Sequence, residues 1–340
     1  MSAKLTKDSV FTATSGMRMP VVGLGTLARS TEERSSDEDI TKAVEYALEA
    51  GYRHFDTAYM YRNEKAVGNA LKKWLDSGRI KREELFVVTK LPMVGNNEKL
   101  VERYLKESLQ DLQLSYVDLY LIHKPVGFQP GKELFPTDEN GYLKLDLDTD
   151  HIALWKAMEA QVDAGRAKFI GLSDFTIAQM ERILKVARIR PSTDQVECHL
   201  YFQRKELREW GKKNGIPVTS FATLGSGAAV SIFDKGGNMT EQQKKNPMTE
   251  EVVIRIAQAH GKSPGQVLLR HMVQLGVAVI PKSSHPDRIK QNIDIFDFEL
   301  TDKDMADLGA FDLGEGGRKF FVSNMVKGYD KHPECPYGKP

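Results

Sequence analysis

Short apolar runs recur along the chain, and most of them alternate with stretches in which apolar residues are spaced three and four apart. The runs are rich in β-branched and aromatic residues, which is typical of parallel strands covered on both faces. Several runs begin just after a glycine, and glycine adopts the left-handed conformation that ends a helix without steric cost. The eight predicted strands are residues 21–25, 52–55, 85–90, 117–123, 168–172, 194–198, 218–222 and 278–282.

The stretches between these runs have the apolar spacing of amphipathic helices. Ser36 with the acidic residues after it is a good N-cap for the first of them. Alternating strands and helices predict an α/β protein, a (β/α)₈ TIM barrel forming a single domain over residues 1–340. Residues 10–19 are predicted to form an N-terminal β-hairpin that plugs the bottom of the barrel. The predicted helices are residues 36–50, 63–76, 98–112, 151–163, 176–187, 204–214, 251–260 and 263–275.

Composition excludes several classes of function. The net charge is +1, and no basic stripe interleaved with aromatic residues suggests nucleic-acid binding. Two cysteines, Cys198 and Cys335, fit a reducing compartment and make neither a disulfide framework nor a metal cluster, so no metal site is predicted. No apolar leader or run of about 18 apolar residues is present, so we expect a cytoplasmic protein that does not span a membrane.

Four titratable residues lie at or just after the ends of successive predicted strands. They are Asp56, Tyr61, Lys90 and His123. Active sites of a (β/α)₈ barrel lie at the carboxyl ends of the strands, so these side chains are expected to converge. An ammonium beside a phenol lowers the pKa of the phenol, and a carboxylate keeps that ammonium charged. The set therefore predicts a site that protonates a ketone or aldehyde while it accepts a hydride.

The run Gly23-x-Gly25-x-x-Ala28 loosely matches a dinucleotide-binding fingerprint. That fingerprint requires a helix that opens directly at the loop, so that its N-terminus meets the pyrophosphate. Here polar residues 29–37 intervene before or at the helix start. We therefore reject a Rossmann fold.

Several longer motifs resemble those of the aldo-keto reductases, in the order in which that family has them and over nearly the whole chain. They are Met-Pro-x-x-Gly-Leu-Gly-Thr at 19–26, Gly-Tyr-Arg-His-Phe-Asp-Thr-Ala-Tyr-Met-Tyr at 51–61, Val-Thr-Lys-Leu at 88–91, Asp-Leu-Tyr-Leu-Ile-His at 118–123, Gly-Leu-Ser at 171–173 and Ile-Pro-Lys-Ser at 280–283. The resemblance implies a (β/α)₈ barrel that reduces aldehydes and ketones with NADPH, and a C-terminal loop, residues 311–340, over the substrate pocket.

The resemblance also implies roles for single residues. Tyr61 would be the proton donor, Lys90 would lower its pKa, Asp56 would pair with Lys90, and His123 would orient the carbonyl. The hydride would come from C4 of the nicotinamide. Ser173, Asp174 and Gln195 would hold its carboxamide and Phe221 would stack on its ring. Thr26 is also implied as a cofactor-binding residue. The other implied cofactor residues are Leu224 and Ser226 in the loop that covers the pyrophosphate, Lys282, Ser283 and Arg288 at the 2′-phosphate, and Gln291 and Asn292 at the adenine.

Four positions depart from the family's usual pattern. Asp174 replaces an Asn, and it could accept from the carboxamide NH₂, stay protonated, or leave the contact to Ser173. Phe221 replaces a Tyr, while Leu27 and Lys124 replace Trp residues. A pocket lined by Leu27 and Met60, with a flexible cation at its rim, is expected to be wide. It suggests a bulky ketone substrate and resembles arthropod members that reduce 3-oxo ecdysteroids.

Alternatives stay open at this stage. The chain could be a generalist detoxifying aldehyde reductase, a redox-sensing regulatory barrel, or a structural protein derived from a reductase. The intact set of Asp56, Tyr61, Lys90 and His123 favours an enzyme. We expect a monomer whose partner is a small carbonyl compound, with neither nucleic acid nor membrane as a partner; the sequence does not identify the physiological substrate or the direction of the reaction.

Overall fold

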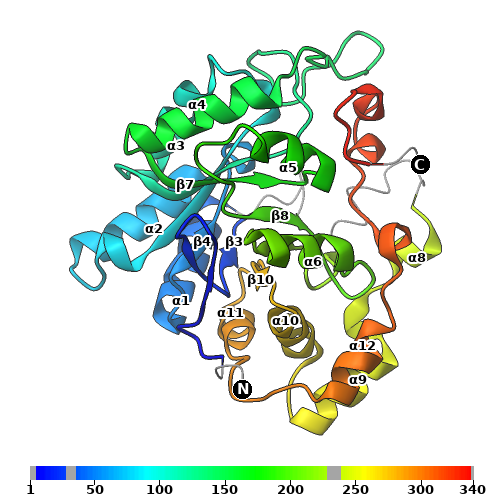
Figure 1. Cartoon of the computed structure of the whole chain (residues 1–340). Coiled ribbons are helices and arrows are strands. Elements are labelled where there is room, and N and C mark those ends of the chain that lie inside the picture. The colour runs from blue at the N-terminus through cyan, green and yellow to red at the C-terminus, as the bar shows by residue number, and fades with distance from the viewer. Residues whose placement is uncertain (1–4, 28–35, 228–238, 338–340) are drawn as a thin grey trace.

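The computed structural model describes residues 5–27, 36–227 and 239–337. Its centre is a sheet of eight strands, and Figure 1 shows helices arranged around these strands. Neighbouring strands pair in parallel and follow one another in chain order, from β3 to β10. The eight strands are β3 (Leu24–Gly25), β4 (His54–Asp56), β5 (Phe86–Leu91), β6 (Val117–Ile122), β7 (Ala167–Ser173), β8 (Asp194–Glu197), β9 (Val218–Phe221) and β10 (Ala278–Val279).

The sheet closes on itself between its first and last strands. Val22 and Val279 form a parallel bridge, and the amide of Gly23 donates to the carbonyl of Val279 at 2.8 Å. The amide of Gly25 continues the seam by donating to the carbonyl of Pro281 at 3.2 Å. This closure confirms the predicted (β/α)₈ barrel, in which parallel strands leave no free edge.

The glycines of the rejected dinucleotide fingerprint serve this closure. A Cβ at Gly25 would lie 2.6 Å from the carbonyl oxygen of Ile280, and a Cβ at Gly23 would lie 2.6 Å from Cγ of His54. Both distances are shorter than atoms tolerate, so only glycine lets the backbone and the His54 ring approach here. The two glycines are needed for packing within the barrel.

Helices begin and end close to the predicted residues. Ser36 caps the first helix as expected: its side chain accepts from the amide of Asp39, whose carboxylate accepts from the amide of Ser36. Gly51 and Gly215 end their helices with positive φ angles of 97° and 66°. The helices are α1 (Asp37–Ala50), α2 (Glu64–Asp76), α3 (Val101–Leu112), α4 (His151–Asp163), α5 (Ile177–Leu184), α6 (Lys205–Asn214), α8 (Glu241–Lys244), α9 (Glu251–His260), α10 (Pro264–Gln274), α11 (Pro286–Ile293) and α12 (Asp302–Gly309).

Three of these helices, α8, α11 and α12, were not predicted. Helix α11 begins at Pro286, a residue that suits the first turn of a helix because it needs no amide donor there. Helix α12 has a capping box between Thr301 and Asp304. Helix α11 was missed because we had interpreted residues 282–292 as ligand-binding positions alone. Helices α11 and α12 are also only eight residues long, so each has little apolar periodicity to detect.

The N-terminal hairpin is formed by β1 (Val10–Thr12) and β2 (Arg18–Pro20), which pair antiparallel. Buried Met17 and Met19 share an apolar cluster with Phe86, Val88 and other strand residues. The amide of Thr14 also donates to the carbonyl of Gly215 at 2.9 Å, at the end of the barrel where strands begin. The hairpin therefore plugs the bottom of the barrel, as predicted.

The segment after α12 returns to the opposite end of the barrel. It contains the 3₁₀ turns η5 (Gly314–Gly317), η6 (Val322–Asn324) and η7 (Tyr329–Lys331) and lies beside the long connection that follows β6 (Figure 1). Leu143 of that connection donates its amide to the carbonyl of Lys327 at 2.9 Å. Within the described ranges no helix is long and apolar enough to cross a membrane.

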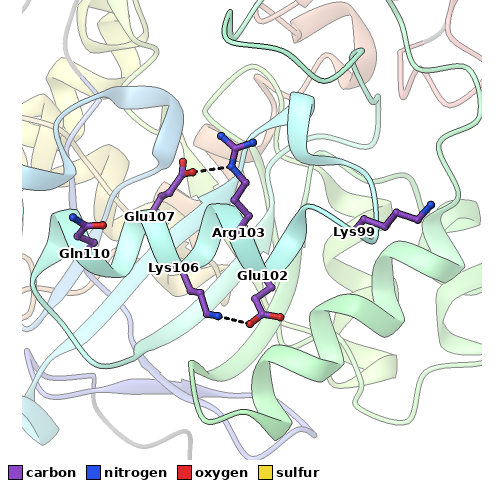
Figure 2. Close-up of a pocket in the computed structure, with 6 residues that line it drawn as sticks. All are labelled: Lys99, Glu102, Arg103, Lys106, Glu107 and Gln110. Carbon is purple, nitrogen blue, oxygen red and sulfur yellow. Dashed lines mark hydrogen bonds and ion pairs between the residues drawn. The ribbon is translucent and has the colours of Figure 1, made fainter.

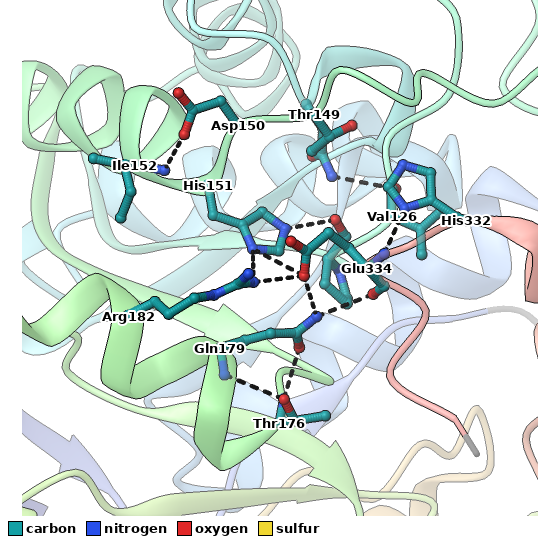
Figure 3. Close-up of polar contacts among 12 residues, drawn as sticks. Val126, Thr149, Asp150, His151, Ile152, Thr176, Gln179, Arg182, His332 and Glu334 are labelled. Carbon is teal, nitrogen blue, oxygen red and sulfur yellow. Dashed lines mark hydrogen bonds and ion pairs between the residues drawn. The ribbon is translucent and has the colours of Figure 1, made fainter.

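Side chains from α4 and α5 hold the end of this segment (Figure 3). The carboxylate of Glu334 accepts from Arg182 at 2.6 Å and from the side-chain amide of Gln179 at 2.9 Å. His332 makes a hydrogen bond of 2.7 Å from Nε2 to the carbonyl of Asp146. The C-terminal segment is thereby bound to elements far earlier in the chain.

Candidate active site

Lys90, Asp56 and Tyr61 meet at the carboxyl ends of neighbouring strands, as predicted. Asp56 is the last residue of β4, Lys90 lies in β5, and Tyr61 ends the 3₁₀ turn η1 (Tyr59–Tyr61). The Lys90 ammonium lies 2.6 Å from Oδ1 of Asp56, 2.8 Å from the carbonyl of Thr57 and 3.3 Å from the Tyr61 hydroxyl. Lys90 has no exposed surface and Asp56 is only 2% exposed. The ammonium is therefore fixed against the phenol by partners that cannot move into water.

The electrostatics of this group depend on burial as well as on charge. Burial alone lowers the pKa of Lys90, but the Asp56 carboxylate and the Tyr61 hydroxyl more than offset it, so the pKa stays above its ordinary value. Burial raises the pKa of Tyr61, and the Lys90 ammonium opposes that rise without cancelling it. The Lys90 ammonium thus lowers the pKa of Tyr61, as predicted, but burial has the larger effect and keeps this pKa above its ordinary value. Tyr61 keeps its proton at neutral pH, which suits a proton donor.

Gln195 on β8 binds this group as well. Its side-chain amide donates to Oδ2 of Asp56 at 2.7 Å, so both oxygens of that carboxylate have a donor. We had predicted Gln195 only as a carboxamide ligand. Its contact with Asp56 joins residues 139 positions apart, and no local pattern in the sequence indicates it.

His123 follows β6 and faces Tyr61. The two rings meet edge to face, with centroids 5.7 Å apart and planes at 75°. Burial, followed by the ammonium groups of Lys90 and Lys124, holds the pKa of His123 well below its ordinary value. The imidazole is therefore neutral at neutral pH and can donate one hydrogen bond.

The prediction that Lys124 is a flexible cation at the pocket rim is wrong. Its ammonium forms an ion pair with Oδ2 of Asp174, and the side chains of Lys124 and Asp174 are 13% and 3% exposed. The same ammonium lies 5.4 Å from the centre of the Phe221 ring. Two departures from the family pattern, at positions 124 and 174, are thus in direct contact.

Asp174 is ionised in this environment. Burial alone raises its pKa, but the Lys124 ammonium and then the guanidinium groups of Arg318 and Arg204 lower the pKa below its ordinary value. The ion pair with Lys124 thus favours the charged form of Asp174 over the protonated one. Its second oxygen, Oδ1, is buried and has no hydrogen-bond partner among the described residues.

Tyr337 brings the C-terminal segment to this pair. Its hydroxyl lies 3.4 Å from Oδ2 of Asp174 and 3.5 Å from the Lys124 ammonium. The Arg318 guanidinium lies over the Tyr337 ring at 4.8 Å. Sequence reasoning identified neither residue, because both come from an irregular segment whose path over the barrel no periodic pattern predicts.

The remaining predicted cofactor residues lie along the same end of the barrel. Buried Thr26 donates from its hydroxyl to the carbonyl of Asp56 at 3.0 Å. Ser173 is buried at the end of β7, beside Gln195 of β8. The last group follows β10 around α11: Ser283 and Asn292 are buried, Lys282 is half-buried, and Arg288 and Gln291 are exposed. Leu224 and Ser226 follow β9 and are half-buried.

Leu27 directly follows Thr26, and Met60 directly precedes Tyr61. Leu27 is 55% exposed and Met60 is partly buried against the main apolar cluster. A hollow lies elsewhere, at α3, and Figure 2 shows that most of the side chains that line it are charged. Two i,i+4 ion pairs, Lys106 with Glu102 and Arg103 with Glu107, account for four of those charges. This hollow contains none of the residues that converge at the strand ends, so it is not the candidate active site.

Comparisons with known proteins agree with this geometry. A model of the family described as "Aldo/keto reductase family" matches residues 21–312. The rat protein "Aldo-keto reductase family 1 member A1" is 40% identical over 342 residues, covering 99% of this chain and 100% of the relative. The soybean "NAD(P)H-dependent 6'-deoxychalcone synthase" is 42% identical over 287 residues, 84% of this chain and 85% of the relative. The solved structure of the aldose reductase from Schistosoma japonicum superposes with a TM-score of 0.84 at 39% identity, covering 96% of this chain and 98% of that one.

Proposed function

The chain belongs to the aldo/keto reductase family, whose members are NADP-dependent carbonyl oxidoreductases, and we propose that it reduces aldehyde and ketone groups to alcohols with Tyr61 as the proton donor. One observation carries the assignment of Tyr61. The buried Lys90 ammonium lies between the Asp56 carboxylate at 2.6 Å and the Tyr61 hydroxyl at 3.3 Å. As Tyr61 gives up its proton, the fixed ammonium stabilises the phenolate that forms.

His123 supplies the second contact to the substrate in this proposal. Its neutral imidazole, edge-on to the Tyr61 ring, donates one hydrogen bond to the carbonyl oxygen and so orients it toward the phenol. Gln195 and Thr57 act through Asp56 and Lys90, because they hold those side chains in place. Tyr61 and His123 are therefore the proposed catalytic residues that touch the substrate.

NADPH would supply the hydride from C4 of its nicotinamide ring. The residues at the barrel mouth fit such a group. Phe221 is only half-buried, and the buried carboxylate oxygen Oδ1 of Asp174 lacks a donor among the residues described. Lys282 and Arg288 flank the start of α11, where helix amides and positive side chains favour a phosphate. We propose that Thr26, Ser173, Leu224, Ser226, Ser283, Gln291 and Asn292 complete the NADPH site.

For the substrate we propose a bulky ketone such as a 3-oxo ecdysteroid. Leu27 and Met60 support this proposal, because neither side chain provides the flat aromatic wall that would narrow the pocket. We also propose that residues 311–337 cover the pocket, and the contacts of Tyr337 with Lys124 and Asp174 support that placement. The same proposal describes a monomeric cytoplasmic enzyme with two free cysteines, Cys198 and Cys335.

The proposed function is tested by following the oxidation of NADPH, and separately of NADH, with a panel of carbonyl compounds. The panel runs from short aliphatic aldehydes through aromatic aldehydes to steroid and ecdysteroid ketones. We expect turnover with NADPH, a much higher KM for NADH, and a kcat/KM for the bulky ketones at least equal to that for the short aldehydes.

Other outcomes select among the alternatives. Efficient turnover of aldehydes with rejection of every bulky ketone would replace the proposed substrate with a generalist role in aldehyde reduction. Tight NADPH binding without turnover of any compound in the panel would refute catalysis and support a redox-sensing or structural role. The purified full-length chain is used throughout.

A further inference from the structure

Lys319, in the segment that follows α12, buries its ammonium between two other stretches of the chain, residues 222–226 and 243–247. The ammonium lies 2.5 Å from the carbonyl oxygen of Lys245 and 3.4 Å from that of Gly225. Only 2% of Lys319 is exposed, and burial lowers its pKa, an effect that the Glu197 carboxylate partly opposes. A buried ammonium costs free energy, and an apolar side chain would fill the same space without that cost. The charge therefore indicates a role beyond packing.

The backbone of Lys319 is anchored independently of its side chain. The amides of Lys319 and Phe320 donate to the two carboxylate oxygens of Glu197 on β8, at 2.7 Å and 3.1 Å. The same carboxylate makes a hydrogen bond of 2.9 Å with Nε2 of His199. Glu197 is fully buried, so the point from which the Lys319 side chain extends is fixed to the wall of the barrel.

The turn at residues 222–226 has a backbone that needs support. Ala222 and Ser226 have positive φ angles of 57° and 41°, which are uncommon for residues other than glycine, and Gly225 has a φ of 77°. A Cβ at Gly225 would lie 2.3 Å from Cδ of Pro247, so the turn packs directly against the second stretch. Strained turns persist only where the surrounding structure holds them. Lys319 is placed to do so, because its ammonium attracts a carbonyl from each stretch.

We propose that Lys319 is a positioning residue for the pyrophosphate of the dinucleotide: its ammonium holds the turn at residues 222–226 against residues 243–247 and so fixes Leu224 and Ser226 where the phosphates bind. This inference rests on the proposed function, in which Leu224 and Ser226 belong to the NADPH site. The family resemblance assigns no cofactor residue to the segment that contains Lys319.

The same contacts tie cofactor binding to the segment that is proposed to cover the substrate pocket. Lys319 belongs to that segment, residues 311–337, and the side-chain amide of Gln243 donates to the carbonyl of its neighbour Arg318 at 3.0 Å. The Phe320 ring also meets the Phe221 ring edge to face, with centroids 5.7 Å apart. The retention of NADPH should therefore depend on a residue outside the dinucleotide site.

Two ligands separate this role from a general loss of structure. NADPH contains the pyrophosphate, whereas adenosine 2′-monophosphate keeps the adenine, the ribose and the 2′-phosphate and lacks it. Isothermal titration calorimetry gives both dissociation constants without any turnover. We expect Lys319→Met to weaken NADPH at least about tenfold, the usual loss for a hydrogen bond to a charged group, and to leave adenosine 2′-monophosphate binding nearly unchanged.

Three further variants complete the test. Lys331→Met removes an exposed ammonium from the same segment and should change neither dissociation constant. Arg288→Ala removes the proposed contact to the 2′-phosphate and should weaken both ligands by a similar factor. Lys319→Gln keeps a neutral donor of similar size, so it should lose less NADPH affinity than Lys319→Met and again spare adenosine 2′-monophosphate. Binding of the smaller ligand also shows that each Lys319 variant is folded.

A smaller loss of NADPH affinity in Lys319→Met, or an equal loss for both ligands in the two Lys319 variants, would overturn the positioning role while leaving NADPH use intact. The second result would show that Lys319 supports only the fold. Failure of the unmodified protein to bind NADPH would instead refute the proposed function, and this inference with it.

Discussion

Glu64, the first residue of α2, buries its carboxyl group between a strand and a helix. The Thr89 hydroxyl donates to one of its oxygens at 2.5 Å and the Ser108 hydroxyl donates to the other at 2.9 Å. Burial raises the pKa of Glu64 to about 7, and these two hydrogen bonds only partly oppose the shift. Both of these hydrogen-bond partners are neutral hydroxyl groups. The folded protein therefore favours the protonated form of Glu64.

This shift predicts a dependence of stability on pH. The unfolded chain releases the Glu64 proton near pH 4.5, whereas the folded protein holds it to about pH 7. The stabilisation of the folded state by protonated Glu64 is therefore fully present below pH 4.5 and is lost as the pH rises through 7. The loss is on the order of 3 kcal/mol in the free energy of unfolding. Glu64→Gln should remove this loss, and urea unfolding from pH 4.5 to 8 measures it. The exposed Glu49→Gln is the control, and equal pH profiles for both variants would contradict the assignment.

Lys124 and Asp174 lead to a second prediction at the scale of single residues. Lys124→Trp alone leaves the Asp174 carboxylate buried without its ion-pair partner, which typically costs about 3–5 kcal/mol. Adding Asp174→Asn removes that charge and should restore most of the stability, as thermal unfolding would show. The double variant should also favour small aromatic aldehydes over a steroid-sized ketone by at least about tenfold in kcat/KM, because the indole fills the pocket. Additive effects of the two substitutions on stability would contradict this coupling.

Individual site residues could be predicted where a strand ends. Asp56, Lys90 and His123 follow apolar runs directly, and parallel strands bring such ends together. The ion pair of Lys124 with Asp174 could not be foreseen from position, because it depends on two side chains 50 residues apart. The raised pKa of Tyr61 was missed because burial, which the sequence does not quantify, outweighs the neighbouring ammonium.

At the scale of elements, the C-terminal segment depends on a few polar contacts with α5. Glu334 lies between Arg182 and Gln179, and both bind the same carboxylate oxygen (Figure 3). Arg182 is half exposed, so the ion pair should contribute only about 0.2–1 kcal/mol to global stability. The contacts matter more for the local order of the segment that carries Tyr337.

Glu334→Ala should therefore speed proteolytic cleavage within residues 311–337 severalfold and change the melting temperature of the barrel little. Mass spectrometry of limited digests locates the cut sites. Glu102→Ala, which removes a surface ion pair on α3, is the matched control and should leave the digestion rate unchanged. Equal digestion of the two variants would show that Glu334 does not hold the segment.

Helices and strands in which apolar residues recur at a regular spacing were predicted well, and irregular segments were not. The alternation of apolar runs and amphipathic stretches indicated eight strands and the helices up to α10, except the short helix α8. Helices α11 and α12 have only about two turns each, and each contains few apolar residues. The path of the segment after α12 depends on long-range contacts such as that of Leu143 with Lys327, which no local pattern reports.

At the scale of the whole molecule, barrel closure brings the two ends of the predicted cofactor site together. Gly25 of β3 lies against the backbone of Ile280, so Thr26 and Lys282 follow neighbouring strands although they are far apart in the chain. The number and order of strands predicted this closure. The close approach itself requires glycine at position 25, and its role was not recognised from the sequence.

Arg288 allows a test of the cofactor at this scale. It lies on α11 and is exposed. Arg288→Ala should weaken NADPH binding by about 1.5–3 kcal/mol, the cost of one charge-assisted contact to a phosphate, and leave NADH binding unchanged. Fluorescence titrations with both dinucleotides measure this difference. Equal weakening of the two would show that Arg288 does not contact the 2′-phosphate.

The central claim is that the Tyr61 hydroxyl, held against the Lys90 ammonium at 3.3 Å, gives its proton to the substrate carbonyl. Tyr61→Phe removes only that hydroxyl, so its most direct test is the single-turnover rate of NADPH oxidation with a saturating carbonyl substrate. We predict that this rate falls by about 10²–10⁴-fold, the usual contribution of a positioned acid, while the dissociation constant for NADPH stays nearly constant. Retention of more than about a tenth of the rate, when hydride transfer is the measured step, would contradict the assignment of Tyr61 as the acid.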